Sequence, residues 1–122
     1  MNNKTDVHFS RLTSFQSGWQ ANGTNYLLQV GGLGVTLLHL SIRLGTIADG
    51  TRILAFSGPT SNNFLHTAPA IDISGRSIVG YLICKPITST SNVEIAVGHL
   101  TGNSAAVADF LILSEPFELS SN

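Results

Sequence analysis

The stretch Gly31-Gly-Leu-Gly-Val-Thr-Leu-Leu-His-Leu-Ser-Ile-Arg-Leu-Gly45 decides the fold class. From Leu38 onward every second residue is aliphatic, and the positions between hold His39, Ser41 and Arg43. Alternation with a period of two is typical of a β-strand that has one buried face and one face in solvent. The stretch therefore predicts a half-buried strand whose outer face carries a histidine and an arginine.

Similar signals recur along the rest of the chain. Short runs rich in Val, Ile, Leu and Phe are separated by Gly, Asn, Asp and Ser positions that favour tight turns, about every eight to twelve residues, and helical periodicity is weak. This pattern predicts an all-β fold, an antiparallel β-sandwich or barrel that is jelly-roll-like. The expected strands are 15–20, 25–30, 35–44, 52–56, 68–73, 77–85, 93–100 and 105–113.

Charged residues are scarce among the 122 residues. They make up 11% of the sequence, whereas hydrophobic residues make up 43%, and the formal net charge is −1. An ordinary soluble domain has roughly 25% charged residues. The six Lys and Arg residues form no basic stripe, so we expect no nucleic-acid partner and no membrane-surface helix. Two explanations fit this composition, an uncharged polar exterior rich in Ser, Thr, Asn and Gly, and a surface partly covered by self-association, since subunit interfaces are depleted in charge at their centres.

We expect one domain, with residues 1–16 as an N-terminal arm or strand and residues 17–122 as a β head. The first residues, Met-Asn-Asn-Lys-Thr-Asp, lack the apolar core of a secretory signal, and no stretch reaches the roughly 20 apolar residues of a membrane span. The single cysteine, Cys84, stands in an apolar run. It is predicted to be a small buried hydrophobic residue.

Two expected strands, 77–85 and 105–113, have apolar residues on both of their alternating sets. In the first strand, one set holds Ile78, Leu82 and Cys84, and the other holds Val79, Tyr81 and Ile83. An antiparallel strand with one face in solvent would alternate with polar residues instead. The second apolar face must therefore be covered, either by another subunit or by long loops of the same chain, and both alternatives stay open.

No pattern in the chain marks a catalytic or metal site. The histidines at positions 8, 39, 66 and 99 lack the spacing of a zinc site, and no cysteine pair assists them. Gly31-Gly-Leu-Gly34 lacks the spacing of a dinucleotide-binding loop, and Ser57-Gly-Pro59 is not a nucleophile elbow. We therefore expect no enzyme, no metal and no cofactor.

The chain does have the ingredients of a saccharide site. Such sites place an aromatic ring against the apolar face of a sugar and use planar polar side chains to bond its hydroxyl groups, because an unpaired buried polar group costs about 1–3 kcal/mol. The candidate saccharide-binding residues are Trp19, His39, Arg43, His66, Asp72 and Arg76.

Structural roles compete with these assignments. Large aromatic residues are buried on average, so Trp19 also fits a packing role, and His39 and Arg43 also fit an ordinary solvated strand face. His99 shares the alternation of aliphatic residues and is expected to be a hydrogen-bonded core histidine. Asp109 lies on an otherwise apolar set, so it must pair with another group or cap an interface.

Three segments, in order, resemble the head domain of tailed-phage receptor-binding proteins from tail tips and baseplates. They are Ser17-Gly-Trp19, the stretch 31–44, and Asp49-Gly-Thr-Arg-Ile-Leu-Ala-Phe-Ser-Gly-Pro59, followed by a β-rich half. The resemblance covers roughly residues 17–114 and rests on pattern more than on motif. Family members often carry Leu-Pro followed by a second proline a few residues on, whereas here a single Pro59 follows Ser-Gly.

The resemblance implies a β-sandwich or barrel head that forms a homotrimer and binds host cell-surface saccharide. It also implies contacts with other virion tail proteins and a place in the virion tail after synthesis in the host cytoplasm. An assembly of several heads gains avidity from individually weak sugar sites. The alternatives are a non-catalytic structural virion module, a small β-sandwich lectin and a trimeric tumour-necrosis-factor-like ligand.

Overall fold

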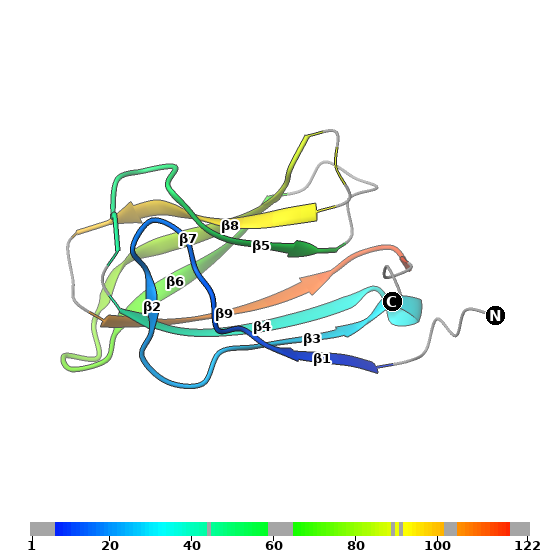
Figure 1. The fold of residues 1–122 in the computed structure, drawn as a ribbon, viewed down its shortest axis with the longest axis horizontal. Coiled ribbons are helices and arrows are strands. Elements are labelled where there is room, and N and C mark those ends of the chain that lie inside the picture. Colours follow the sequence, from blue (N-terminus) through cyan, green and yellow to red (C-terminus); the bar gives the residue numbers. More distant parts are fainter. Residues whose placement is uncertain are drawn as a thin grey trace.

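The computed structural model describes residues 7–43, 45–58, 65–88, 90, 92–101 and 105–117. These residues form nine strands and one 3-10 turn, and every strand pair is antiparallel, so the fold is all-β (Figure 1). The elements are β1 (Val7–Arg11), β2 (Gln20–Ala21), β3 (Tyr26–Val30), η1 (Gly31–Leu33), β4 (Val35–Arg43), β5 (Arg52–Ser57), β6 (His66–Asp72), β7 (Ile78–Pro86), β8 (Asn92–Leu100) and β9 (Ala105–Leu113).

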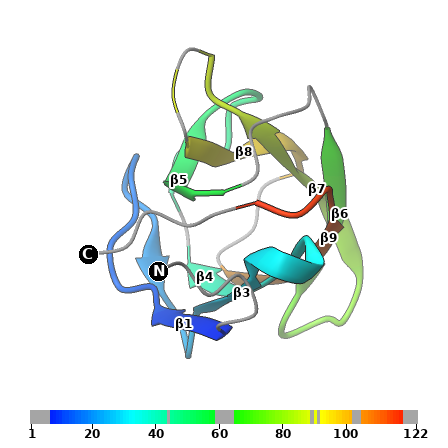
Figure 2. The ribbon, with the colours of Figure 1, turned by 90° about the vertical axis from the view of Figure 1, so that its right-hand side faces the viewer.

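All nine strands belong to one sheet. Its order is β1-β3-β4-β9-β6-β7-β8-β5, and the short β2 pairs with β4. The sheet curls into a half-barrel, so that β5 and β8 lie on the opposite side of the core from β3 and β4 (Figure 2). The prediction of an antiparallel β-sandwich or barrel is thereby confirmed at the level of fold class.

The core forms where the inner faces of the two sides meet. Leu38, Leu40 and Ile42 of β4 point inward and are at most 2% exposed, and Val93 and Ile95 of β8 are completely buried. The residues between them on β4 point outward or are covered by neighbouring strands. The alternation from Leu38 to Arg43 therefore has the structural meaning that the sequence predicts, whereas over 35–37 the inward residue is Thr36 and the outward residues are aliphatic.

Seven of the eight expected strands agree with the structure to within two residues at each end. The expected strand 15–20 is wrong, because Ser17 and Gly18 both adopt positive φ angles, 58° and 81°, and only Gln20 and Ala21 are extended enough to pair. Strand β1, within the predicted arm or strand of residues 1–16, pairs with β3 over five residues.

Two β-bulges change which residues of β7 and β8 face the core. In β7, Gly80 pairs with Ala70 while Ile78 pairs with Ile71, so one extra residue is inserted and the alternation of side chains reverses. As a result Ile78 is 71% exposed, although Leu82 is buried. The predicted grouping of Ile78 with Leu82 and Cys84 on one face is therefore wrong.

The half-barrel is open between its edge strands, β1 and β5. The chain between β1 and β2 lies along this seam (Figure 2), where the backbone N–H of Gln16 donates to the carbonyl of Ile53 at 2.7 Å. From β3, the Gln29 side-chain Nε2 donates to the carbonyl of Ser57 at 2.8 Å. Side-chain and loop hydrogen bonds thus replace a strand pairing at the seam. Among the described residues, no helix is both long and apolar enough to cross a membrane.

Candidate functional site

The most distinctive surface of the molecule is the outer side of β1, β3, β4 and β9. The strand register places four apolar residues, one per strand, side by side in each of two rows. One row is Val7, Val30, Val35 and Leu113, and the other is Phe9, Leu28, Leu37 and Leu111. We call these eight residues the apolar face.

The apolar face is uncovered within the described part of the chain. Its four outer members, Val7, Phe9, Leu111 and Leu113, are 56–65% exposed. A typical monomer exposes no contiguous apolar patch larger than about 300–600 Å², and larger patches mark interaction sites. The sequence allows strand 105–113 to be covered by loops of the same chain or by another subunit. Among the described residues no loop covers it, and coverage by another subunit stays a prediction.

A third row borders the apolar face and is polar and aromatic. It contains Arg11, Tyr26, His39 and Asp109, again one residue from each strand. The ring of Tyr26 stacks on Phe9 on one side and on His39 on the other, with centroid distances of 5.7 and 5.2 Å. The Nδ1 atom of His39 lies 2.6 Å from Oδ1 of Asp109, so Asp109 does pair, as its place among apolar residues required.

Trp19 is not a sugar platform. Its side chain is only 5% exposed and belongs to the hydrophobic core. The packing is close, because a Cβ atom added to Gly45 would lie 2.4 Å from the Trp19 ring. The turn at Ser17 and Gly18 directs the indole inward, and the assignment of Trp19 to a saccharide site is therefore corrected to a core role.

His39 and Arg43 lie on the outer side of β4, as their alternation predicts. The Arg43 guanidinium donates from Nε and Nη2 to Oδ1 of Asn22, at 3.1 and 2.5 Å. His39 is held by Asp109 and Tyr26. Both side chains reach the surface, although each is engaged within its own chain.

The remaining three candidates do not join them. Asp72 ends β6 and Arg76 lies in the turn between β6 and β7, where Asp72 Oδ1 accepts hydrogen bonds from the N–H and the hydroxyl of Ser74, both at 3.0 Å. Arg76 has a φ of 55° and closes this turn. His66 begins β6, at the opposite end of that strand from Asp72, which is roughly 20 Å away at 3.3 Å per residue. The six candidates therefore form no single site.

His99 differs from its expected core position. The second bulge, where Tyr81 pairs with His99 but Leu82 pairs with Val97, turns His99 to the surface. Its Nδ1 atom lies 3.1 Å from Oδ1 of Asp49, and both side chains are more than half exposed. The expectation of a core histidine is wrong because no sequence signal placed the bulge.

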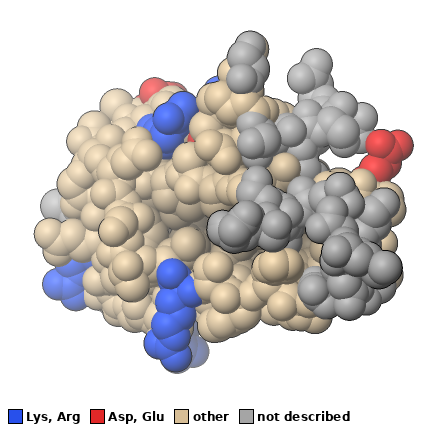
Figure 3. All heavy atoms as spheres, turned by 45° about the vertical axis from the view of Figure 1, so that its right-hand side comes forward, with Lys and Arg blue, Asp and Glu red and all other residues tan. Residues whose placement is uncertain are grey.

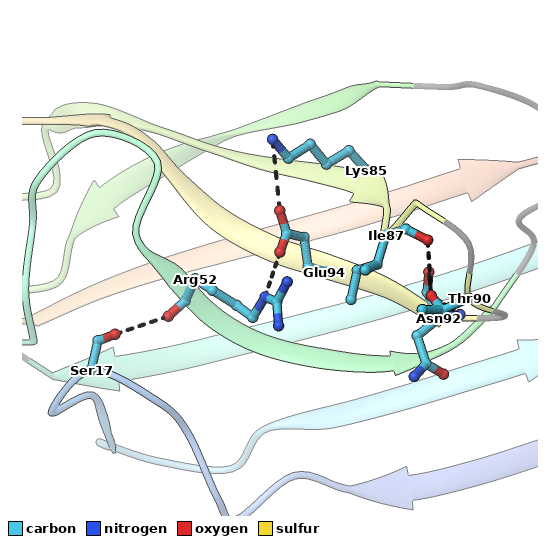
Figure 4. Close-up of polar contacts among 7 residues, drawn as sticks. All are labelled: Ser17, Arg52, Lys85, Ile87, Thr90, Asn92 and Glu94. Atoms are coloured by element: carbon cyan, nitrogen blue, oxygen red, sulfur yellow. Dashed lines mark hydrogen bonds and ion pairs between the residues drawn. The ribbon is translucent and has the colours of Figure 1, made fainter.

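A charge cluster on the outside of β5, β7 and β8 has a structural role. Glu94 is almost buried, with Oε1 2.5 Å from Nε of Arg52 and Oε2 3.7 Å from Nζ of Lys85 (Figure 4). The two cations come from the strands that flank β8 and cover the carboxylate from both sides (Figure 4). This arrangement satisfies a buried carboxylate and leaves no reactive group facing a cavity.

Cys84 lies beside this cluster, fully buried on the inner side of β7. Burial, and to a lesser extent the nearby Glu94 carboxylate, raise the pKa of the Cys84 thiol from 9.0 to about 12. Because the folded-state pKa is the higher one, this group's contribution to stability is complete below about pH 9 and is lost as the pH rises toward 12.

We expect the Cys84 thiol of the folded protein to react with Ellman's reagent at about pH 8 at least 100-fold more slowly than in guanidinium chloride, because only the thiolate attacks the reagent. The absorbance of the released thionitrobenzoate measures both rates. The unfolded chain is its own control, since its thiol has an ordinary pKa. Similar rates in the two states would show that β7 opens frequently.

A cleft of about 260 Å³ lies at the seam. Its lining includes His8 and Ser10 of β1, Gln29 of β3 and Phe56 of β5. Ligand pockets are usually about 300–1,000 Å³, so this cleft is below their range. It is a gap left by the missing pairing between β1 and β5.

The rest of the described surface adds no other charged site. Charged side chains are few and scattered on the face shown in Figure 3. Within the described residues, no group of three or more His, Cys, Asp or Glu side chains could hold a metal ion. The apolar face and the row beside it are therefore the candidate functional site.

Sequence reasoning missed the three residues that β1 contributes to this site, because it predicts residues 1–16 only as an arm or strand. The signal was present, since Val7, Phe9 and Arg11 alternate with the polar His8 and Ser10.

Comparison of the chain with models of protein families, with curated proteins and with solved structures finds no match.

Proposed function

We propose that this chain is a non-catalytic head domain that works as an assembly of identical copies joined through the apolar face. The observation that supports the proposal is the uncovered double row of eight apolar residues, in a chain with only 11% charged residues. Burying each of its larger side chains is worth about 1.5–3 kcal/mol. Assembly is the simplest way to remove this surface from water.

Within this role we propose host adhesion, of the kind that the resemblance to tailed-phage receptor-binding heads implies. Several heads held together would present several copies of a weak saccharide site, and avidity would raise their overall affinity. Arg43 is the candidate that fits this proposal, because it is exposed on the outer side of β4, four residues beyond His39, whose row borders the apolar face and would be covered with it. The number of copies, three by resemblance, stays a prediction.

A structural virion module is the second candidate function. It is favoured by one observation, which is that the six candidate saccharide residues are spread over the fold and that Trp19 lies in the core. Such a module would use the same apolar face and need no sugar site. Retention on immobilised bacterial cell-wall polysaccharide would favour adhesion, and retention only on other tail proteins would favour the structural role.

Light scattering on a sizing column tests the assembly. We expect the mass to be a multiple of the 12.9 kDa of one chain. We expect Leu111→Lys to weaken association at least 100-fold, because it places a charge within the apolar contact. The domain should stay folded by circular dichroism, since Leu111 points away from the core.

Ile78→Lys is the matched control. Ile78 is exposed to a similar degree but lies on β7, outside the apolar face, and its replacement should leave the mass unchanged. A wild-type mass of one chain at all concentrations would contradict the proposed assembly.

A further inference from the structure

The row beside the apolar face has opposite charges at its two ends. Arg11 stands at one end, on the edge strand β1, and Asp109 stands at the other end, on β9. Three strand spacings separate them, which is roughly 14 Å. They are therefore too far apart to pair within one chain.

Both end residues have capacity for an external partner. Arg11 takes part in none of the four ion pairs found among the described residues. Asp109 uses Oδ1 to bind His39, and its side chain is 67% exposed. The row thus presents a guanidinium and a carboxylate at a fixed spacing on the same surface.

We propose that the apolar face packs on the same face of a second copy, related by a two-fold axis that runs along the strands between β3 and β4. This inference rests on the proposed assembly and adds its geometry, a pair of copies in place of the three that the resemblance implies. Rotation about that axis lays β1 of one copy over β9 of the other and keeps each row opposite itself. Phe9 then faces Leu111, Val7 faces Leu113, and Arg11 faces Asp109.

The match of apolar rows and of opposite charges favours this axis, and it favours a second copy of the chain as the partner. The two apolar rows meet apolar rows, and the ends of the third row meet as two symmetric pairs of opposite charge. An in-plane axis across the strands would reverse the order of the rows and lose both pairs. An interface in which the same patch serves both subunits is the form that two-fold dimers use, and aligned packing of two sheets is a common geometry.

Two charge-reversed variants, Arg11→Glu and Asp109→Arg, test the pairing. Each variant alone puts like charges at both ends of the contact, so we expect it to associate at least 10-fold more weakly than the wild type. In a one-to-one mixture, a heterodimer of the two variants restores opposite charges at both ends. Light scattering and native mass spectrometry should therefore show recovery as heterodimers.

Two further variants make the test independent of folding defects. The double variant Arg11→Glu with Asp109→Arg restores both pairs in a homodimer and is expected to associate within about 3-fold of the wild type. Arg76→Glu changes charge in the turn between β6 and β7, away from the face, and should have no effect.

The outcomes separate this inference from the proposed assembly. A mixture as weak as either variant, or a wild-type mass near three chains, would overturn the two-fold pairing while self-association stands. A wild-type protein that stays a single chain would overturn both. Recovery in the mixture and in the double variant supports the inference.

Discussion

Replacing Gly80 by alanine is expected to destabilise the domain by about 3 kcal/mol or more, enough to unfold a large fraction of a marginally stable domain at physiological temperature. Gly80 forms the bulge in β7 with a φ of 146°, and an added Cβ would lie 1.9 Å from the carbonyl oxygen of His99 on β8. The backbones of β7 and β8 cannot move apart at this point without breaking the pairing of the two strands. Urea unfolding followed by circular dichroism measures the loss.

Gly50→Ala is the matched control for this substitution. Gly50 also has a positive φ, 86°, but no atom lies within 4 Å of its added Cβ. Gly50→Ala should therefore lower the free energy of unfolding only by the cost of a left-handed backbone at a residue with a Cβ, about 1–2 kcal/mol. Equal losses for the two variants would show that the contact with His99 is relieved by a small shift of β8.

Replacing Trp19 by alanine is expected to cost about 3–5 kcal/mol of unfolding free energy, because it leaves a cavity in the core where the two sides of the half-barrel meet. The indole contacts Gly45 closely, and a loop anchored by one glycine has little means to fill the space. Chemical unfolding measured by far-ultraviolet circular dichroism reports the change without depending on tryptophan fluorescence.

Trp19→Phe is the companion variant. The Nε1 atom of Trp19 is buried without a hydrogen-bond partner among the described residues, so phenylalanine removes a polar group that costs about 1–3 kcal/mol to bury. Trp19→Phe should therefore lower the free energy of unfolding much less than Trp19→Ala does. If Trp19→Ala were as stable as the wild type but lost polysaccharide binding, the core role assigned to Trp19 would be wrong.

The sequence predicts what depends on local alternation. Strand β4 is predicted to within one residue, since Leu38, Leu40 and Ile42 have a period of two and the outward positions from His39 onward are polar. The buried state of Cys84 also followed from the apolar run around it. These features depend on neighbours in the chain, which a single sequence displays.

Features that depend on strand order could not be predicted. His39 meets Asp109 because β9 lies beside β4, and no local pattern reports a pairing across 70 residues. The bulge that exposes His99 depends on how β8 fits β7, and Gly98 alone does not reveal it. Side-chain chemistry alone nominates the candidate saccharide residues, and the topology separates Asp72 and Arg76 from His66.

The pairing of β4 with β9 also governs when the domain can fold. Nine residues of β4 pair with nine of β9, yet the whole of β5 to β8 lies between them in the chain. Long-range strand pairing is slow because the loop must close before its contacts form. During synthesis, β3 and β4 leave the ribosome as a hairpin with its apolar residues exposed, and they stay so until the last strand emerges. Until β9 is complete, the nascent chain therefore exposes apolar surface through which it can aggregate.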